Sequence, residues 1–399
     1  MIGRRPKVAM VVQRAGREVN GGAEALCRDV ALALARSWDI TIVTTTAVDY
    51  VTWEPDYPAG PGDIEGVPVL RFDVDEPRSQ HHFDTLSRRI MARLDSAPLA
   101  EQEAWMRAQG PYSTTLLRYL EDHGGEYDLV IFYTYLYATT YFGLPLVRDR
   151  AVLVPFAHDE WPIHLPMWDE RFRMPQEVVF STPEERDFLR RRFNRQFDGP
   201  VIGIGVDLHD DVSGERFRQR FGITNPFAIY VGRIDPAKGC DQLLEDFAQH
   251  KRRKDDDLIL VMLGRAAMPV PVLPYVRPLG FVDEGTKFDA LAASEMLVMP
   301  SALESLSISL LEAWSVGRPV LVNSASDVLV GQSRRANAGL WYGDAAELSA
   351  AVDLLRGPAG VALGANGRAF VGQSYAWPKI VEKYERLYES VARALSSPS

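Results

Sequence analysis

The sequence has little cysteine, no long hydrophobic run and no excess of basic charge. Its only two cysteines, Cys27 and Cys240, match no metal-ligand spacing, so we interpret both as buried free thiols of a reducing compartment. No stretch approaches the roughly 18 apolar residues that a membrane-spanning helix needs. The formal net charge of −10 argues against nucleic-acid binding, because such proteins carry a basic stripe. These absences predict a cytoplasmic protein with no nucleic-acid partner.

Two familiar nucleotide-binding signatures are missing as well. The dinucleotide fingerprint G-x-G-x-x-G does not follow the first expected strand, which argues against a nicotinamide enzyme. The phosphate-binding loop G-x-x-x-x-G-K-[ST] does not occur. The short apolar run that follows Lys7 ends at Gln13 and Arg14, so we expect a mature N-terminus rather than a signal peptide.

Apolar segments of strand length alternate with helical patterns along the whole chain, which predicts parallel α/β sheets. The first series of expected strands is Lys7–Val12, Ile40–Thr45, Val67–Phe72, Leu129–Tyr133, Ala151–Phe156 and Val178–Ser181. The second series is Phe227–Val231, Leu258–Leu263, Tyr275–Leu279, Met296–Met299 and Pro319–Val322. Expected helices include Ala23–Arg36, Pro183–Phe193, Cys240–His250, Lys287–Ala293, Ser305–Ser315 and Pro378–Leu395, and Thr52–Gly66 is interpreted as a loop. Two complete series in 399 residues predict two doubly wound domains, with ligand bound in the crevice at the strand ends.

Three segments at strand ends carry groups that suit a charged, hydroxyl-rich ligand. The first is Asn20-Gly21-Gly22, between the first strand and its helix. Its glycines permit positive φ and close approach of an anion to the free N–H groups of the helix start. Alternatively, Asn20 only caps the helix.

The second segment runs from Gly232 to Gly239 and follows the first strand of the second series. It contains Arg233 and Lys238, two cations that can converge on a diphosphate. The alternative for such a loop is a pair of solvated surface cations.

The third segment follows the strand Met296–Met299 and contains Glu304 and Glu312. On one helix this spacing places both carboxylates on the same face, where they can accept hydrogen bonds from hydroxyl groups. The alternative is that Glu304 is a helix-capping acid and Glu312 an unrelated surface residue.

Together, Gly21-Gly22, the Arg233 and Lys238 loop and the Glu304-x7-Glu312 segment resemble the family 4 retaining glycosyltransferases, in order and spacing, from residue 7 to about residue 390. The resemblance implies the α/β GT-B fold, in which two doubly wound, Rossmann-like domains face a central cleft. It implies an acceptor-binding domain over residues 1–200, joined by the C-terminal helix 378–399, and a nucleotide-sugar-binding domain over residues 201–377.

The resemblance also implies roles for individual residues. Arg233 and Lys238 would bind the diphosphate, Glu304 the transferred sugar and Glu312 the ribose. The catalytic candidates are Glu304, His158, Arg233 and Lys238, where His158 matches the histidine that lines the family's sugar pocket. The donor-binding candidates are Gly21, Gly22, Gly232, Arg277, Ser305, Leu306, Ser307 and Glu312. Arg277 belongs to the segment that resembles the base-binding stretch, and Ser307 stands where the family often has glycine.

The expected reaction is transfer of a sugar from a nucleoside-diphosphate sugar to an acceptor that the sequence does not identify. No cofactor and no metal are expected, and Asp73-Val74-Asp75, which has the form of a metal-binding D-x-D motif, is interpreted as a solvated loop. Two other functions stay open: a catalytically weak regulatory subunit that binds nucleotide sugar, and a sugar-nucleotide epimerase. A pyridoxal-dependent phosphorylase would be a much longer chain.

The acceptor side of the sequence is less informative. Aromatic residues in the first domain suit either sugar stacking or a core. A basic cluster, Arg190, Arg191, Arg192 and Arg195, suits either a solvated helix face or a weak peripheral contact at the inner face of a membrane.

Overall fold

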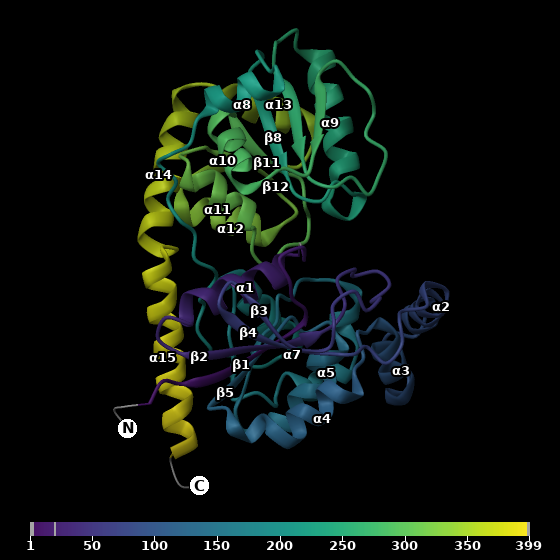
Figure 1. The fold of residues 1–399 in the computed structure, drawn as a ribbon. Coiled ribbons are helices and arrows are strands. Elements are labelled where there is room, and N and C mark those ends of the chain that lie inside the picture. The colour runs from purple at the N-terminus through teal and green to yellow at the C-terminus, as the bar shows by residue number, and fades with distance from the viewer. Residues whose placement is uncertain (1–3, 20, 397–399) are drawn as a thin grey trace. The chain divides into compact units, whose positions relative to one another are not determined.

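The computed structural model describes residues 4–19 and 21–396. The chain divides into two compact units, drawn in Figure 1. The first unit comprises Met1–Ile204 and Ile380–Ser399, and the second comprises Gly205–Lys379. Asn20, the candidate helix cap, lies outside the described residues.

The first unit contains a seven-stranded sheet in the order β3-β4-β2-β1-β5-β6-β7. Its strands are β1 Lys7–Arg14, β2 Asp39–Thr45, β3 Gly60–Ile64, β4 Val67–Phe72, β5 Leu129–Tyr133, β6 Ala151–Val154 and β7 Glu177–Val178. Neighbouring strands are parallel except β3 and β4, which pair antiparallel. Strands β1 and β5 are buried almost throughout, as expected for a parallel sheet with helices on both faces.

Helices cover both faces of this sheet, and Figure 1 shows α1 and α4 on opposite sides of it. The helices are α1 Gly22–Leu34, α2 Gln80–Met91, α3 Leu99–Gln109, α4 Thr114–His123, α5 Ala138–Gly143, α6 Met167–Arg171 and α7 Pro183–Phe193, with 3-10 turns η1 Gly124–Glu126, η2 Leu144–Val147 and η3 Trp161–His164. The terminal helix α15, Trp377–Ser396, also packs here, because its Tyr384 hydroxyl lies 3.4 Å from that of Tyr133 in β5.

The second unit contains a six-stranded sheet in the order β10-β9-β8-β11-β12-β13, and all its pairs are parallel. Its strands are β8 Phe227–Val231, β9 Ile259–Leu263, β10 Val276–Gly280, β11 Met296–Met299, β12 Val320–Asn323 and β13 Gly339–Tyr342. Its helices are α8 Gly214–Phe221, α9 Cys240–Arg253, α10 Glu284–Ala293, α11 Ile308–Ser315, α12 Asp327–Ala336, α13 Ala345–Leu355 and α14 Pro358–Ser374, with the 3-10 turn η4 Pro236–Lys238.

Three expectations about the elements were wrong. The segment Thr52–Gly66 is not all loop, since β3 forms there as a short antiparallel partner of β4. Strand β13 was not expected. The helix expected at Ser305–Ser315 begins only at Ile308, because the Ser307 side chain accepts the backbone N–H of Leu310 and caps the helix there.

Both sheets reverse their strand order at one point, which lies between β1 and β5 in the first unit and between β8 and β11 in the second. Doubly wound sheets bind ligands beyond the carboxyl ends of the strands at this switch point. The loops there are residues 15–19 and 134–137 in the first unit, and residues 232–239 and 300–307 in the second. The Arg233 and Lys238 loop and the Glu304 loop therefore lie side by side, because β8 and β11 are neighbours in the sheet.

Candidate functional site

The loop after β8 is shaped by two glycines at positive φ. Gly232 has a φ of +152° and Gly239 a φ of +72°, conformations that other residues rarely adopt. A Cβ on Gly239 would lie 2.6 Å from the carbonyl oxygen of Pro300 in the loop after β11. Gly239 therefore lets the two loops of the switch point pack closely together.

A short ion pair joins these two loops. Lys238 Nζ lies 2.7 Å from Glu304 Oε1, with Lys238 36% and Glu304 11% exposed. The Asp235 carboxylate accepts a hydrogen bond from the Lys238 backbone N–H and forms an ion pair with Arg233 Nε. The two cations and Glu304 thus gather at one edge of the sheet, and Lys238 keeps part of its side chain in contact with solvent.

Glu304 and Glu312 do not share one helix face, which corrects the expectation from their spacing. Glu304 lies in the loop before α11, whereas Glu312 lies within α11. The capping role that was the alternative for Glu304 belongs to Ser307. Glu312 instead pairs with Lys287 of α10, with Nζ and Oε1 2.7 Å apart.

The segment Ser305–Ser307 differs in part from its expected role. The backbone N–H of Ser307 donates to Gln332 Oε1 over 3.3 Å, so this group is engaged within the protein. Leu306 is buried. The Gln332 side chain is also buried, and its Nε2 has no hydrogen-bond partner among the described residues. The sequence did not indicate that Gln332 contacts this segment.

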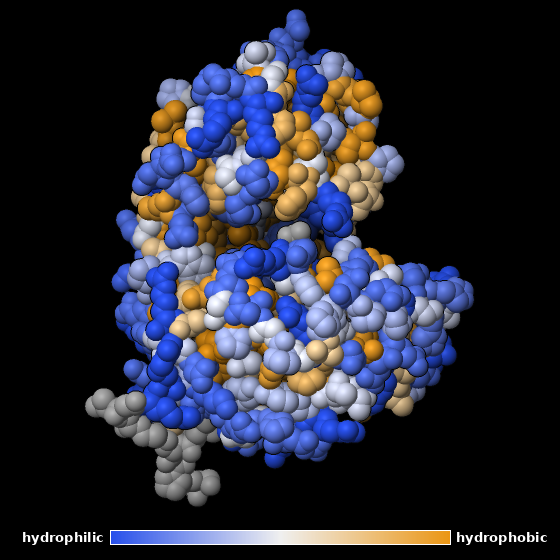
Figure 2. Space-filling model, in the orientation of Figure 1, coloured by the Kyte–Doolittle hydropathy of each residue, from blue (hydrophilic) through white to orange (hydrophobic). Residues whose placement is uncertain are grey.

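Arg277 lies on the edge strand β10, one strand further out than β9, and is exposed. Phe281, which directly follows β10, is also exposed. Figure 2 shows hydrophobic residues on the outer edge of the second unit beside α9 and mostly hydrophilic residues over α4 of the first unit. The exposed Phe281 ring next to the Arg277 strand is an apolar surface that suits stacking against a flat ring.

In the first unit, Gly21 and Gly22 do not have the positive φ that we expected. Gly21 is extended, with a φ of −148°, and caps α1. A Cβ on Gly21 would lie 2.1 Å from Glu24 Oε2, so any larger residue here would displace this carboxylate. Glu24 is buried and paired with Arg14, with Oε1 and Nε 2.5 Å apart.

His158 follows β6 in a segment whose Phe156 has an unusual φ of +51°. The Nδ1 atom of His158 is buried without a hydrogen-bond partner among the described residues. Its Nε2 lies 3.8 Å from Glu160 Oε1, which accepts the Tyr135 hydroxyl at 2.8 Å. The imidazole therefore stands beside a carboxylate at the carboxyl edge of the first sheet.

A buried carboxylate holds the backbone next to His158. Glu185 of α7 accepts the backbone N–H of Ala157 at 2.7 Å and that of Ser181 at 2.6 Å. Burial raises the pKa of Glu185 to about 8, against the opposing effect of these backbone hydrogen bonds. Glu185 thus links the segments after β6 and β7, a role that no sequence pattern indicated.

Three of the four arginines in the basic cluster donate to backbone carbonyls within the first unit, two of them from α7 and Arg195 from the segment after it. Arg190 donates to the carbonyl of Phe197, Arg192 to that of Ile163, and Arg195 to that of Phe172. No helix within residues 4–19 and 21–396 is long and apolar enough to cross a membrane.

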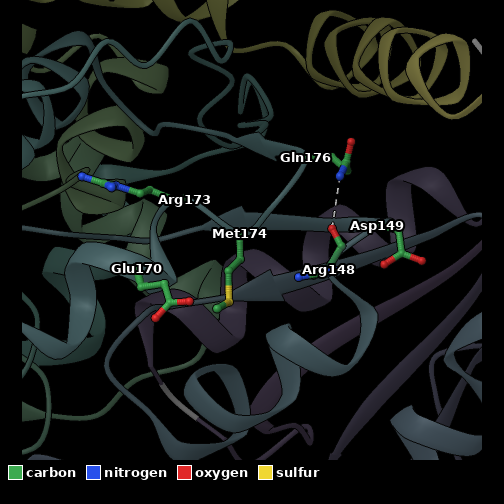
Figure 3. Close-up of a pocket in the computed structure, with 6 residues that line it drawn as sticks. All are labelled: Arg148, Asp149, Glu170, Arg173, Met174 and Gln176. Atoms are coloured by element: carbon green, nitrogen blue, oxygen red, sulfur yellow. Dashed lines mark hydrogen bonds between the residues drawn. The ribbon is translucent and has the colours of Figure 1, made fainter. Parts of the chain in front are cut away.

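The pocket drawn in Figure 3 lies in the first unit, away from the candidate residues. It is lined by Arg148, Asp149, Glu170, Arg173, Met174 and Gln176. These residues precede β6 and β7, so the pocket opens at the amino ends of the strands, opposite to the edge that binds ligands in doubly wound sheets. The acidic and basic side chains there are mixed, and we assign the pocket no part in the site.

A metal site is not apparent in the described part of the chain, where no three His, Cys, Asp or Glu side chains gather suitably. Asp75 of the D-x-D motif accepts hydrogen bonds from the backbone N–H and the hydroxyl of Thr114. Asp75 therefore anchors the loop that precedes α4.

Comparisons with known proteins fit this geometry. Residues 225–356, all in the second unit, match the family model described as glycosyl transferases group 1. The chain is 27% identical over 178 residues to alpha-D-kanosaminyltransferase of Streptomyces kanamyceticus, covering 40% of this chain and 46% of that protein. It is 27% identical over 232 residues to a GDP-mannose-dependent mannosyltransferase of Corynebacterium glutamicum, covering 52% and 61%. The chain spans about half the length of the curated relatives it matches.

Solved structures agree over nearly the whole chain. Sucrose-phosphate synthase of Thermosynechococcus elongatus superposes with a TM-score of 0.74 at 18% identity, covering 98% of this chain and all of the other. HepE of Anabaena, solved with UDP and glucose, gives a TM-score of 0.68 at 16% identity and covers 97% and 100%. The fold is GT-B, and residues 225–356 of the second unit resemble glycosyl transferases of group 1.

Proposed function

We propose that the protein is a retaining glycosyltransferase that moves a sugar from a nucleoside-diphosphate sugar to an acceptor of unidentified structure, either a glycan, a lipid-linked molecule or a small molecule. The observation that carries this proposal is the Lys238–Glu304 ion pair, which joins two loops at the switch point of the second sheet. Lys238 can bind the diphosphate of such a donor, and the adjacent Glu304 can accept hydrogen bonds from the hydroxyls of its sugar.

The charges fit the demands of the reaction. Charge grows on the departing phosphate, and prepositioned cations stabilise it better than mobile water does. Lys238 and Arg233 supply these cations, and Lys238 remains accessible enough to turn from Glu304 toward a phosphate oxygen. Glu304 then accepts hydrogen bonds from the transferred sugar, while His158 and Glu304 orient and polarise the reacting groups.

The proposed reaction needs no side-chain base. An acceptor hydroxyl attacks the anomeric carbon from the face that the phosphate leaves, so the configuration is retained. The anomeric carbon–oxygen bond to the phosphate breaks, and an oxygen of the departing diphosphate takes the hydroxyl proton. We propose that the two cations serve in place of a metal ion.

The nucleoside is proposed to lie along the second unit, with its ribose at Glu312 and its base near Arg277 and Phe281. A nucleoside-diphosphate donor is supported by the UDP bound in the HepE structure and by the GDP-mannose in the name of the mannosyltransferase relative. These two nucleotides differ in their base, so both belong in any donor screen.

A donor panel tests the proposal directly. UDP-, GDP-, ADP- and dTDP-sugars are incubated with the protein in excess EDTA, and released nucleoside diphosphate and free sugar are measured. We expect slow hydrolysis of one donor, with the anomeric configuration retained when followed by proton NMR.

Each other outcome contradicts a defined part of the proposal. Binding of a donor without any turnover would favour the regulatory subunit, and interconversion of the donor sugar would favour the epimerase. Activity that requires added Mg²⁺ or Mn²⁺ would contradict metal independence, and an inverted product would contradict the retaining mechanism.

A further inference from the structure

Besides the Lys238–Glu304 pair, the second unit contains another lysine–glutamate pair that the sequence did not indicate. Lys287 of α10 and Glu312 of α11 lie 2.7 Å apart, and only 14% and 12% of their side chains are exposed. Lys287 also lies 2.8 Å from Glu284, whose side chain is largely exposed. The Lys287–Glu312 pair joins the helix that enters β11 to the helix that leaves it.

Both the helix that carries Lys287 and its ammonium group are held by local contacts. The helix, α10, is capped by Asp283, which accepts hydrogen bonds from the backbone N–H and the hydroxyl of Thr286. The Lys287 Nζ lies 5.0 Å from the ring of Phe288, which packs against His209 with ring centres 3.6 Å apart. Burial opposes the charge on Lys287, but Glu312 and Glu284 outweigh it, so the pKa of Lys287 is raised above its ordinary value. The lysine therefore stays charged over the physiological range.

Glu312 depends on this cation more than an exposed glutamate would. A carboxylate withdrawn from water is strongly disfavoured when it loses its partner, whereas an exposed pair contributes little. Without Lys287, the Glu312 carboxylate would lose a positive charge 2.7 Å away that favours its ionised form and fixes the direction of its Oε1 atom. Losing that charge weakens an acceptor at the place where the ribose is proposed to bind.

We propose that Lys287 is a positioning residue of the nucleotide site, which keeps the Glu312 carboxylate ionised and oriented to bind the 2′ hydroxyl of the donor's ribose. The inference rests on the proposed function, since it assigns Glu312 to the ribose. Lys287 acts through Glu312 and contacts no reacting atom. Its effect is therefore confined to nucleotides that carry the ribose hydroxyl.

The test compares ribonucleotides with their 2′-deoxy counterparts. Affinities of the full chain for UDP, GDP, dUDP and dGDP are measured by titration calorimetry, and the base that binds more tightly is used for the variants. A hydrogen bond to a charged group is worth about 10- to 100-fold in affinity. We expect the wild-type protein to prefer the ribonucleotide by that factor, and Glu312→Gln to lose the preference.

Lys287→Met is expected to weaken ribonucleotide binding about 10- to 100-fold, leave 2′-deoxynucleotide binding unchanged and abolish the preference. Lys287→Arg should restore part of it. Lys254→Met is the matched control, because Lys254 forms a similar 2.8 Å pair with Asp353 that is about half exposed on both sides. Lys254→Met should keep the full preference. If Lys287→Met does not fold, Lys287→Gln replaces it in the same comparison.

The possible results distinguish a wrong role for Lys287 from a wrong assignment of Glu312 to the ribose. A Lys287→Met or Lys287→Gln protein with the wild-type preference, beside a Glu312→Gln protein that has lost it, overturns the inference alone. Equal loss of affinity for both nucleotides in the Lys287 variants also overturns it, because a merely structural role would act in that way. A wild-type protein without any preference, or a Glu312→Gln protein that keeps it, contradicts the assignment of Glu312 to the ribose and with it this part of the proposed function.

Discussion

The two switch points of the molecule have the same topology but place their charged pairs differently. In the first unit, Arg14 and Glu24 are both over 90% buried, at 8% and 7% exposed, and Gln13 donates to the same Glu24 oxygen. In the second unit, Lys238 is 36% exposed although its partner Glu304 is only 11% exposed. A buried cation that is paired with a buried carboxylate stabilises the fold, whereas a cation that is partly exposed to solvent can change partners and bind a ligand.

Glycine has a different role at each of these points. Gly21 makes room for the Glu24 carboxylate inside the first unit. Gly239 makes room for the backbone of the neighbouring loop, so that Lys238 and Glu304 meet. We therefore expect loss of the first pair to affect stability and loss of the second to affect the proposed donor binding.

The largest effect is expected from Glu24→Ala in the first unit. Removing one partner of a buried ion pair leaves Arg14 uncompensated, which costs about 3–5 kcal/mol of unfolding free energy. Urea unfolding measures this change, with Glu126→Ala as the control, because Glu126 pairs with Lys7 near the surface. A loss below about 1 kcal/mol, the usual range for exposed pairs, would contradict the structural role of the Arg14–Glu24 pair.

A second stability effect comes from Glu185, which is buried like Glu24 but bonded to backbone N–H groups. Burial raises its pKa to about 8 from the ordinary value of 4.5, so the folded protein holds a proton that the unfolded chain releases between these pH values. Its contribution to stability is therefore fully present below pH 4.5 and is lost as pH rises through 8, a decrease on the order of 5 kcal/mol.

Urea unfolding at several pH values tests this prediction. Glu185→Gln should flatten the dependence between pH 5 and 8, and Asp187→Asn, at a half-exposed position of the same helix, is the control. An unchanged slope in Glu185→Gln would show that this carboxylate does not titrate as described.

Lys238→Ala should slow turnover of the donor about 10²- to 10³-fold, the scale for losing one group that stabilises charge in the transition state. The melting temperature should change little, because Lys238 is partly exposed. Steady-state release of nucleoside diphosphate measures the first quantity and a thermal melt the second. Lys254→Ala is the control, and normal turnover in Lys238→Ala would mean that the second switch point is as structural as the first.

Glu304→Gln and Glu312→Gln should change different kinetic constants, each by a smaller factor of about tenfold. Glu312 is proposed to hold the ribose, which does not react, so its loss should raise KM for the donor. Glu304 is proposed to contact the transferred sugar, whose charge changes during reaction, so its loss should lower kcat more. Equal effects of both variants on KM alone would remove Glu304 from the sugar site.

The sequence predicted the sheets, most strands and the loops of the second switch point, because buried parallel strands and glycine-bounded loops have strong local patterns. It placed Arg233, Lys238 and Glu304 at the ends of two strands, and the structure shows that these strands are neighbours and brings the residues together. The start of α11 was misplaced because Ser305, Ser307 and Ser309 offer similar caps, and only the tertiary contacts choose Ser307.

The supporting residues could not be found in the sequence. Lys287 meets Glu312 across two helices, and Glu185 reaches Ala157 across two strand ends, so both contacts depend on packing between distant segments. The surroundings of Gly21 could not be predicted for a related reason, since its close neighbour is the buried Glu24 carboxylate, and its φ is not positive.

Photoaffinity labelling tests most directly which switch point holds the donor. UDP-glucose and GDP-mannose with an azide on the base are cross-linked to the full chain, and the labelled tryptic peptides are identified by mass spectrometry. Our account predicts labelling of the peptide that spans residues 266–287 and contains Arg277 and Phe281, with loss of the label when unmodified nucleotide competes. Specific labelling of the peptide 18–28, which contains Gly21 and Glu24, would contradict it.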